Sequence, residues 1–138
     1  MDQPVGRVIF VDDDPQVLAG LKSRLWGLRR MWHLTFVPSG EAALAEMGQQ
    51  RFDAIISDMR MPVMDGAQLL TEVARRHPET DRIVLSGQSD ATASVRALAV
   101  AHRFLSKPCP PGQLEAVLNE IAERRGRPTG HLRVSGVD

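Results

Sequence analysis

The chain has 138 residues, a formal net charge of zero and one cysteine, and 43% of its residues are hydrophobic. This length suits one domain with one core, and the even charge balance argues against direct nucleic-acid binding, which normally needs a basic excess. A lone Cys109 excludes an internal disulfide framework, and no apolar run approaches the roughly 20 residues that span a membrane, so we expect a cytoplasmic protein with no membrane segment.

Short apolar runs alternate with longer amphipathic stretches along the chain. The apolar runs predict five strands, at residues 7–11, 34–37, 53–57, 82–86 and 103–106. The amphipathic stretches predict five helices: one from Pro15 with a leucine stripe that reaches Leu28, one over 39–47, one from about Gln68, one from Ala91 and one from Pro111. Strand–helix alternation repeated five times indicates an α/β fold, with a parallel sheet covered by helices on both faces.

Two helix caps, the two tryptophans and the C-terminal residues refine this outline. Ser39 is expected to cap the second helix, and Asp90 can cap the fourth. Trp26 and Trp32 are expected to extend the first helix and its exit by packing against the core, and an exposed Trp32 would mark a docking surface. Residues 126–138 are rich in Gly and polar residues without periodicity, so we expect one domain over residues 1–125 and a flexible tail over 126–138.

Polar residues collect at the carboxyl ends of the predicted strands, which is where open parallel sheets bind their ligands. In chain order they are Asp12, Asp13, Asp14, Asp58, Ser86, Ser106 and Lys107. If strands one, three, four and five are neighbours, these groups converge on one pocket. Two unit charges about 4 Å apart repel by roughly 4 kcal/mol at an effective dielectric near 20, and a divalent cation removes that repulsion.

The carboxylates therefore divide into two sets. Asp12, Asp13 and Asp58 are predicted ligands or supporting anchors of Mg²⁺, for which Mn²⁺ can substitute. Asp14 directly precedes Pro15 and is predicted to cap the following helix instead. With a metal in place, the carboxylate of Asp58 is a candidate nucleophile that accepts a phosphoryl group as an acyl phosphate.

The remaining polar groups suit the phosphoryl oxygens. Lys107 would pair with one oxygen as a point charge. The hydroxyl of Ser86 would donate a hydrogen bond to another. Each of these signals is weak alone, but four of them at the ends of different strands favour phosphoryl chemistry strongly.

The stretches VIFVDDDP, DAIISDMRMPVMDG, IVLSG and RFLSKPC resemble, in their order and spacing, the response regulator receiver domains of two-component signalling, the CheY-like superfamily. The resemblance covers about residues 6–124. It implies a flavodoxin-like, doubly wound sheet of strand order 2-1-3-4-5 with five helices. It also implies that Asp58 receives its phosphoryl group from a histidine kinase or a phosphotransfer protein.

The same resemblance implies a role for individual positions. The acid pair corresponds to Asp12 and Asp13, and the third metal contact from the protein is the backbone carbonyl of Arg60. Lys107 stands at the position of the family's invariant lysine, and the Lys107–Pro108 peptide bond is expected to be cis.

The resemblance further implies how the switch operates. Ser86 stands at the hydroxyl position and Phe104 at the switch aromatic, so the face formed by helix four, strand five and helix five is expected to change on phosphorylation. That face would control a separate output protein or the formation of a homodimer. Arg60 and Gln88 would flank the water that attacks the acyl phosphate and so tune dephosphorylation.

Other interpretations remain open at this point. A Mg²⁺-dependent phosphohydrolase with an aspartyl nucleophile also uses a parallel sheet, but such enzymes typically carry an acid two residues after the nucleophile. Arg60 stands there and cannot deliver a proton near neutral pH, which favours a switch with only self-phosphorylation and self-dephosphorylation over an enzyme. The chain could also be a receiver fragment of a longer regulator or a degenerate receiver used as a fixed scaffold, although no residue of the acidic site is missing. Asp65 is expected to form a turn with Gly66, and Phe104 could be plain core packing.

Overall fold

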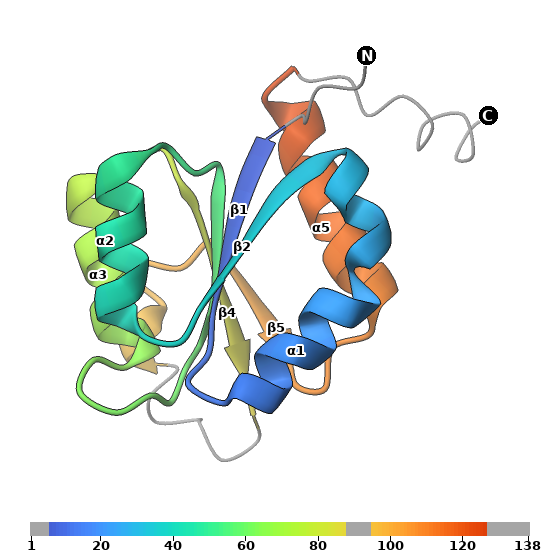
Figure 1. The fold of residues 1–138 in the computed structure, drawn as a ribbon. Helices are drawn as coiled ribbons and strands as arrows, with labels where there is room; N and C mark the ends of the chain where they lie inside the picture. Colours follow the sequence, from blue (N-terminus) through green and yellow to red (C-terminus); the bar gives the residue numbers. More distant parts are fainter. Residues whose placement is uncertain (1–5, 88–94, 127–138) are drawn as a thin grey trace.

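A parallel sheet of five strands forms the centre of the molecule, in the order β2-β1-β3-β4-β5 (Figure 1). The computed structural model describes residues 6–87 and 95–126. Its strands are β1 (Gly6–Val11), β2 (Trp32–Val37), β3 (Ala54–Asp58), β4 (Asp81–Ser86) and β5 (Arg103–Ser106). Its helices are α1 (Pro15–Arg24), the short 3₁₀ helix η1 (Trp26–Arg30), α2 (Gly40–Gln49), α3 (Gly66–Arg76) and α5 (Pro111–Arg124). The predicted α/β class and the flavodoxin-like strand order are confirmed.

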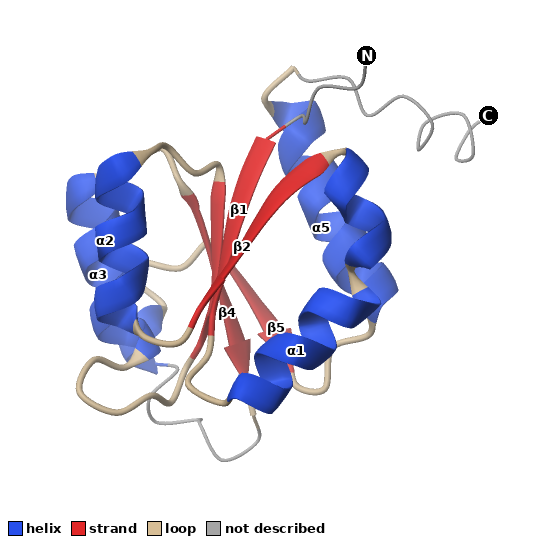
Figure 2. Ribbon diagram, viewed as in Figure 1, coloured by secondary structure: helices blue, strands red, loops and turns tan. Residues whose placement is uncertain are grey.

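Helices cover both faces of the sheet, with α1 and α5 on one side and α2 and α3 on the other (Figure 2). Successive residues of a strand point to opposite faces. In β1, Val8 and Phe10 therefore join the core beneath α1 and α5, whereas Ile9 and Val11 join the core beneath α2 and α3. All four side chains are at most 2% exposed. Burial on both sides explains why this strand is one unbroken apolar run.

The first helix ends earlier than the leucine stripe predicts. α1 stops at Arg24, and the chain tightens into η1, in which the N–H of Leu28 donates to the carbonyl of Leu25 at 2.9 Å. Gly27 lies inside this tightened turn, and glycine is the poorest helix former after proline. Leu28 is nevertheless buried, so the stripe correctly marked which residues face the core but not how far the α-helix extends.

The two tryptophans differ in burial. Trp32 is the first residue of β2 rather than a helix exit, and its side chain is 0% exposed. Trp26 is 53% exposed on η1. Packing against the core is therefore confirmed for Trp32, because β2 begins two residues before the predicted strand and carries this side chain into the core, and it is wrong for Trp26.

Side-chain caps fix where the helices begin. A carboxylate oxygen of Asp14 accepts the N–H of Gln16 at 2.9 Å, with Pro15 opening α1, as predicted. Ser39 caps α2 by accepting the N–H of Ala42 at 3.1 Å, also as predicted. Asp65 does more than form a turn, because it is the N-cap of α3, which starts at Gly66, about two residues before the expected start.

The segment between β4 and β5 is described only in part. Residues 95–97 are helical, and Gln88, Asp90 and the expected start of the fourth helix at Ala91 lie outside the described residues. The proposed tail after residue 126 lies outside them as well. No helix in the described part of the chain is both long enough and apolar enough to cross a membrane.

Candidate phosphoryl-acceptor and metal site

Three carboxylates meet where β1 and β3 end. Asp12 and Asp13 follow β1 directly, and Asp58 is the last residue of β3. One carboxylate oxygen from each residue can be chosen so that all three lie within 4.8 Å of one another. Asp12 is 2% exposed and Asp58 is 7% exposed, whereas Asp13 faces solvent. The site thus places two buried carboxylates behind an accessible one.

Lys107 brings a positive charge to this cluster from the end of β5. Its Nζ donates to Oδ1 of Asp58 at 2.7 Å and lies 3.5 Å from Oδ2 of Asp12. Its backbone N–H donates to the carbonyl of Ser86 at 3.0 Å, which ties the exit of β5 to the end of β4. The Lys107–Pro108 peptide bond is cis, the form that the family resemblance implies.

The charges of the site do not cancel evenly. Burial raises the pKa of Asp58, the hydrogen bond from Lys107 opposes that rise, and the charge of Asp12 adds to it. Burial alone would lower the pKa of Lys107, but the hydrogen bond and charge of Asp58, together with Asp12, raise it. The net effect is a stabilised ammonium group beside a carboxylate that resists ionisation, because burial and the charge of Asp12 outweigh the hydrogen bond from Lys107.

The donor set fits a hard divalent cation. Mg²⁺ prefers carboxylate oxygens and water, and is usually bound by one or two protein carboxylates. Asp12, Asp13 and Asp58 supply such oxygens on one side of the cluster, and the exposure of Asp13 leaves that side open to water.

Asp12 and Asp14 of the acid run at residues 12–14 bind different backbone N–H groups. Oδ1 of Asp12 accepts the N–H of Asp14 at 2.9 Å, which fixes the turn after β1 and leaves Oδ2 directed toward Lys107. Asp14 itself caps α1. Two of the three adjacent carboxylates are therefore engaged by backbone donors, and the third, Asp13, faces solvent.

A close backbone approach behind Asp58 was not recognised in the sequence. A Cβ placed on Gly66 would lie 2.5 Å from the carbonyl oxygen of Asp58 and 2.9 Å from Cα of Met59. The N–H of Gly66 donates to the carbonyl of Met59 at 2.8 Å. Only glycine lets α3 begin directly against the end of β3, so Gly66 sets how closely α3 approaches Asp58. The dipeptide Asp65-Gly66 was the only sequence signal for this close approach, and by itself such a dipeptide indicates only a turn.

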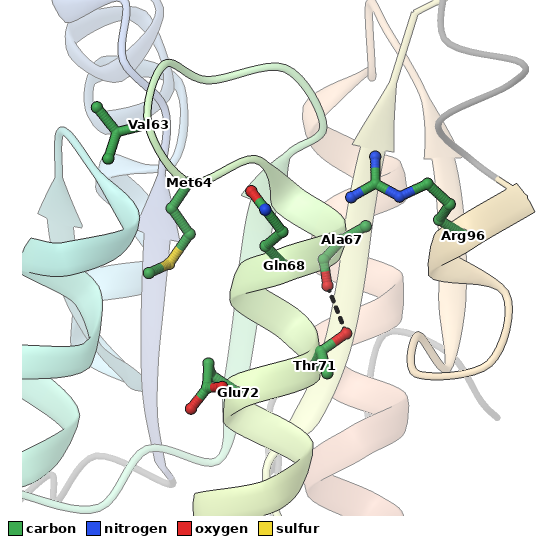
Figure 3. A pocket seen from close by; sticks show the side chains of 7 residues that line it. All are labelled: Val63, Met64, Ala67, Gln68, Thr71, Glu72 and Arg96. Atoms are coloured by element: carbon green, nitrogen blue, oxygen red, sulfur yellow. Dashed lines mark hydrogen bonds between the residues drawn. The ribbon is translucent and has the colours of Figure 1, made fainter.

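The loop after β3, the helix α3 and Arg96 border a separate hollow. The hollow is about 450 Å³ and is lined by Val63, Met64, Ala67, Gln68, Thr71, Glu72 and Arg96 (Figure 3). None of the three clustered carboxylates lines it. Arg96 reaches toward α3, where its guanidinium pairs with the capping residue Asp65 at 2.9 Å. This ion pair links the segment before β5 to the start of α3.

Val63, in the same loop, is 87% exposed and has a φ of 72°. A β-branched residue in this left-handed region is strained.

The other predicted residues lie as follows. Ser86 ends β4, and its hydroxyl donates to the carbonyl of Gly87 at 3.3 Å. Phe104 lies on β5 and is 36% exposed. Arg60 is exposed in the loop after β3, and its role as a carbonyl ligand stays a prediction. Gln88 lies outside the described residues.

Comparison with known proteins identifies the family. The family model described as the response regulator receiver domain matches residues 8–119. The chain is 35% identical over 122 residues to the transcriptional regulatory protein PrrA of Mycobacterium tuberculosis, covering 87% of this chain and 51% of PrrA. It is 36% identical over 104 residues to the DNA-binding transcriptional regulator NtrC of Salmonella typhimurium, covering 75% of this chain and 22% of NtrC. The chain thus spans about half, or less, of these relatives.

Solved structures agree with the fold. The signal receiver domain of an HD domain-containing protein from Pseudomonas fluorescens superimposes with a TM-score of 0.80 at 28% identity, covering 88% of this chain and 97% of that one. A structure described as adenylate cyclase from Rhodopirellula baltica superimposes with a TM-score of 0.76 at 31% identity, covering 86% of this chain and 87% of that one. Together with the acidic cluster and its lysine, these matches show that the chain belongs to the response regulator receiver domains of two-component systems.

Proposed function

We propose that this receiver domain is switched by phosphorylation of Asp58, with the phosphoryl group supplied by a histidine kinase or a phosphotransfer protein. The observation that carries the proposal is the placement of Lys107 Nζ 2.7 Å from Oδ1 of Asp58, within a cluster of three carboxylates. Such a site holds a nucleophilic oxygen and a cation that can follow negative charge onto an incoming group.

The transfer needs few groups. An Asp58 carboxylate oxygen forms the new O–P bond, while the P–N bond to the donor imidazole breaks and its electron pair returns to the ring nitrogen. Lys107 pairs with a phosphoryl oxygen as charge moves outward from the carboxylate, and the hydroxyl of Ser86 turns to donate to another. A Mg²⁺ ion held by Asp12, Asp13, Asp58 and the carbonyl of Arg60 would neutralise charge on the transferring group. Water later hydrolyses the acyl phosphate, at a rate that Arg60 and Gln88 would tune.

The acceptor is tested with acetyl phosphate and Mg²⁺, followed by intact-mass spectrometry. We expect addition of one phosphoryl group that hydroxylamine removes, as it does from acyl phosphates. Asp58→Asn should abolish the addition. Asp65→Asn is the matched control, because asparagine also caps helices well and the residue lies outside the cluster. Phosphorylation that persists in Asp58→Asn would contradict the assignment.

The output is proposed to run through Ser86 and Phe104. Ser86 is opposite Ser106 in the sheet, and Phe104 is opposite Val84. Because alternate residues of a strand share a face, Ser86 and Phe104 lie on the same face of neighbouring strands, two positions apart. Movement of the Ser86 hydroxyl toward a phosphoryl group would open space into which the partly exposed Phe104 can turn.

This rearrangement would change the surface around β5 and α5, to which a separate output protein or a second copy of the chain would bind. Hydrogen exchange with and without beryllofluoride, a phosphoryl mimic, tests the proposal. The largest changes should fall in residues 87–107. Changes confined to α1 and residues 26–33 would show that the signal leaves through another surface.

A phosphohydrolase remains the alternative of a different class, since it shares the sheet and the aspartyl nucleophile. The side chain of Arg60, two residues after Asp58, is exposed and cannot act as a general acid near neutral pH. We therefore expect no turnover of a chromogenic phosphate monoester. Multiple turnovers that are lost in Asp58→Asn would favour the enzyme.

A further inference from the structure

A surface far from the phosphoryl chemistry combines positive charge with aromatic side chains. We call it the α1–β2 groove. It is a hollow of about 230 Å³ whose lining includes Lys22 of α1, Trp26 and Arg29 of η1, and Trp32, Leu34 and Phe36 of β2. None of these residues belongs to the acidic site or to the surface around β5 and α5.

The charge of this region is one-sided. Residues 15–40 contain Lys22, Arg24, Arg29 and Arg30 but no Asp or Glu, although the whole chain has a net charge of zero. Within the part of the chain that the structure describes, none of these four cations forms an ion pair, whereas the arginines of α3 and α5 pair with carboxylates. The groove therefore presents positive charge that the protein itself does not neutralise.

The aromatic residues give the groove a rigid apolar wall. Trp26 is 53% exposed, and the guanidinium of Arg29 stacks 4.0 Å above its ring while donating to its backbone carbonyl at 2.9 Å. This stacking holds the arginine head in place and so reduces the side-chain entropy that binding would cost. Trp32 also lines the hollow, and its side chain is 0% exposed.

The groove runs along an open edge of the sheet. β2 pairs with β1 only, so its other edge has no strand partner in the described ranges. The carbonyl of Val37 accepts the N–H of Asp12 on the β1 side. Because the backbone groups of successive strand residues alternate in direction, those of Leu34 and Phe36 face the open edge. These groups can hydrogen-bond the main chain of another polypeptide.

We propose that the α1–β2 groove binds an acidic, extended segment of a partner protein, whose main chain pairs with the open edge of β2. An apolar side chain of the segment fills the hollow against Trp26, and its carboxylates pair with Lys22 and Arg29. A concave hollow suits an inserted side chain better than a flat membrane surface, and an open strand edge offers a nucleic acid no matching partner. A polypeptide can fill the hollow with a side chain, pair its carboxylates with the cations and hydrogen-bond its main chain to the open edge of β2.

Intrinsic fluorescence can test this, because the chain contains two tryptophans and Trp26 lies in the groove. The probe is a synthetic tryptophan-free peptide whose alternate positions carry Glu, Val and Glu with Thr between them, so that the carboxylates and the apolar side chain share one face of the extended segment. We expect saturable binding that Lys22→Glu combined with Arg29→Glu weakens at least about tenfold. Arg51→Glu combined with Arg75→Glu makes the same charge change elsewhere on the surface and should leave binding unaltered.

Two further arms separate the kinds of ligand. Methylating alternate backbone nitrogens of the peptide should weaken binding if the strand edge is used. Asp58→Asn should bind the peptide as the wild type does, which keeps this result independent of the phosphoryl switch. Equal binding by the charge-reversed groove variant or by the methylated peptide would overturn the proposal. So would tighter groove-dependent binding of oligothymidine or of phosphatidylserine vesicles than of the peptide.

Discussion

Replacing Asp58 by asparagine should stabilise the protein against unfolding in metal-free buffer at neutral pH. Asp58 is 7% exposed, and its carboxylate shares a 4.8 Å cluster with Asp12 and Asp13. Folding therefore removes water from a charge and places it beside like charges. Asparagine has nearly the same shape, keeps an oxygen that can accept the hydrogen bond from Lys107, and carries no charge.

The size of this stabilisation follows from the attraction and the repulsions that act on the Asp58 carboxylate. At an effective dielectric of about 20, the 2.7 Å contact with Lys107 attracts by about 6 kcal/mol. Repulsion across 4.8 Å is about 3–4 kcal/mol for each carboxylate neighbour, less for the exposed Asp13, and desolvation costs several kcal/mol more. The raised pKa of Asp58 shows that the penalties outweigh the attraction. Because Asp58→Asn retains part of the lysine contact, we expect a gain of about 1–2 kcal/mol, or a Tm rise of about 3–8 °C.

The pH dependence gives a sharper check. The folded pKa of Asp58 lies above its ordinary value of 3.8, so the folded state binds its proton more readily than the unfolded state does. The penalty is therefore fully present above the folded pKa and disappears as the pH falls toward 3.8. The advantage of Asp58→Asn should shrink over the same interval. Urea unfolding in EDTA across this range measures it. A variant that is less stable than the wild type at pH 7 would refute the reasoning.

A second buried carboxylate provides the control. Asp53 is 8% exposed, but it accepts the backbone N–H of Arg7 at 2.9 Å and lies 3.5 Å from the guanidinium of Arg125. It has direct partners and no place in the cluster. Asp53→Asn should therefore destabilise the protein under the same conditions. The same chemical change then has opposite signs at two buried sites, which a general effect of removing negative charge cannot produce.

Three further predictions concern the surroundings of the site. Asp13→Ala should weaken Mg²⁺ binding, seen as a smaller rise of Tm across millimolar Mg²⁺, and an unchanged rise would argue against this ligand. Gly66→Ala should cost at least about 2 kcal/mol because its Cβ meets backbone, whereas Gly48→Ala, on a helix with open space around it, should gain about 0.5–1 kcal/mol in urea unfolding. Asp65→Ala should lose about 1–2 kcal/mol with the α3 cap, and Arg96→Gln only up to about 1 kcal/mol, so equal losses would point to the ion pair instead.

The sequence predicted the sheet and the site for one physical reason. Strands buried on both faces must be apolar throughout, so the polar residue that follows each run marks where the strand leaves the core. In a parallel sheet all those exits lie at one edge. Asp12, Asp58 and Lys107 could thus be placed together although they are far apart in the chain, and the structure brings them within hydrogen-bonding or ion-pair distance.

What the sequence could not predict depends on contacts between distant segments. Leu25 and Leu28 are three residues apart, a spacing that places both on one side of either an α-helix or a 3₁₀ helix over a single turn. The leucine stripe therefore could not show that α1 ends at Arg24. The close approach of Gly66 to β3 depends on how α3 packs, which no local pattern encodes. No local pattern pairs Asp53 with Arg125, which lies 72 positions away at the end of α5.

The position of Lys107 connects the unfavourable burial of the Asp58 charge with the proposed phosphorylation switch. The lysine is held by Asp58 through its side chain and by Ser86 through its backbone N–H. If Asp58 becomes an acyl phosphate, the carboxylate charge moves outward onto the phosphoryl oxygens, and Lys107 must follow it to stay paired. Its backbone bond to the carbonyl of Ser86 would transmit any accompanying shift of the Lys107 backbone to the end of β4, whose last residue Ser86 shares a sheet face with Phe104. The contact that partly offsets the buried charge in the resting protein is thus the contact through which a change at Asp58 would reach β4 and β5.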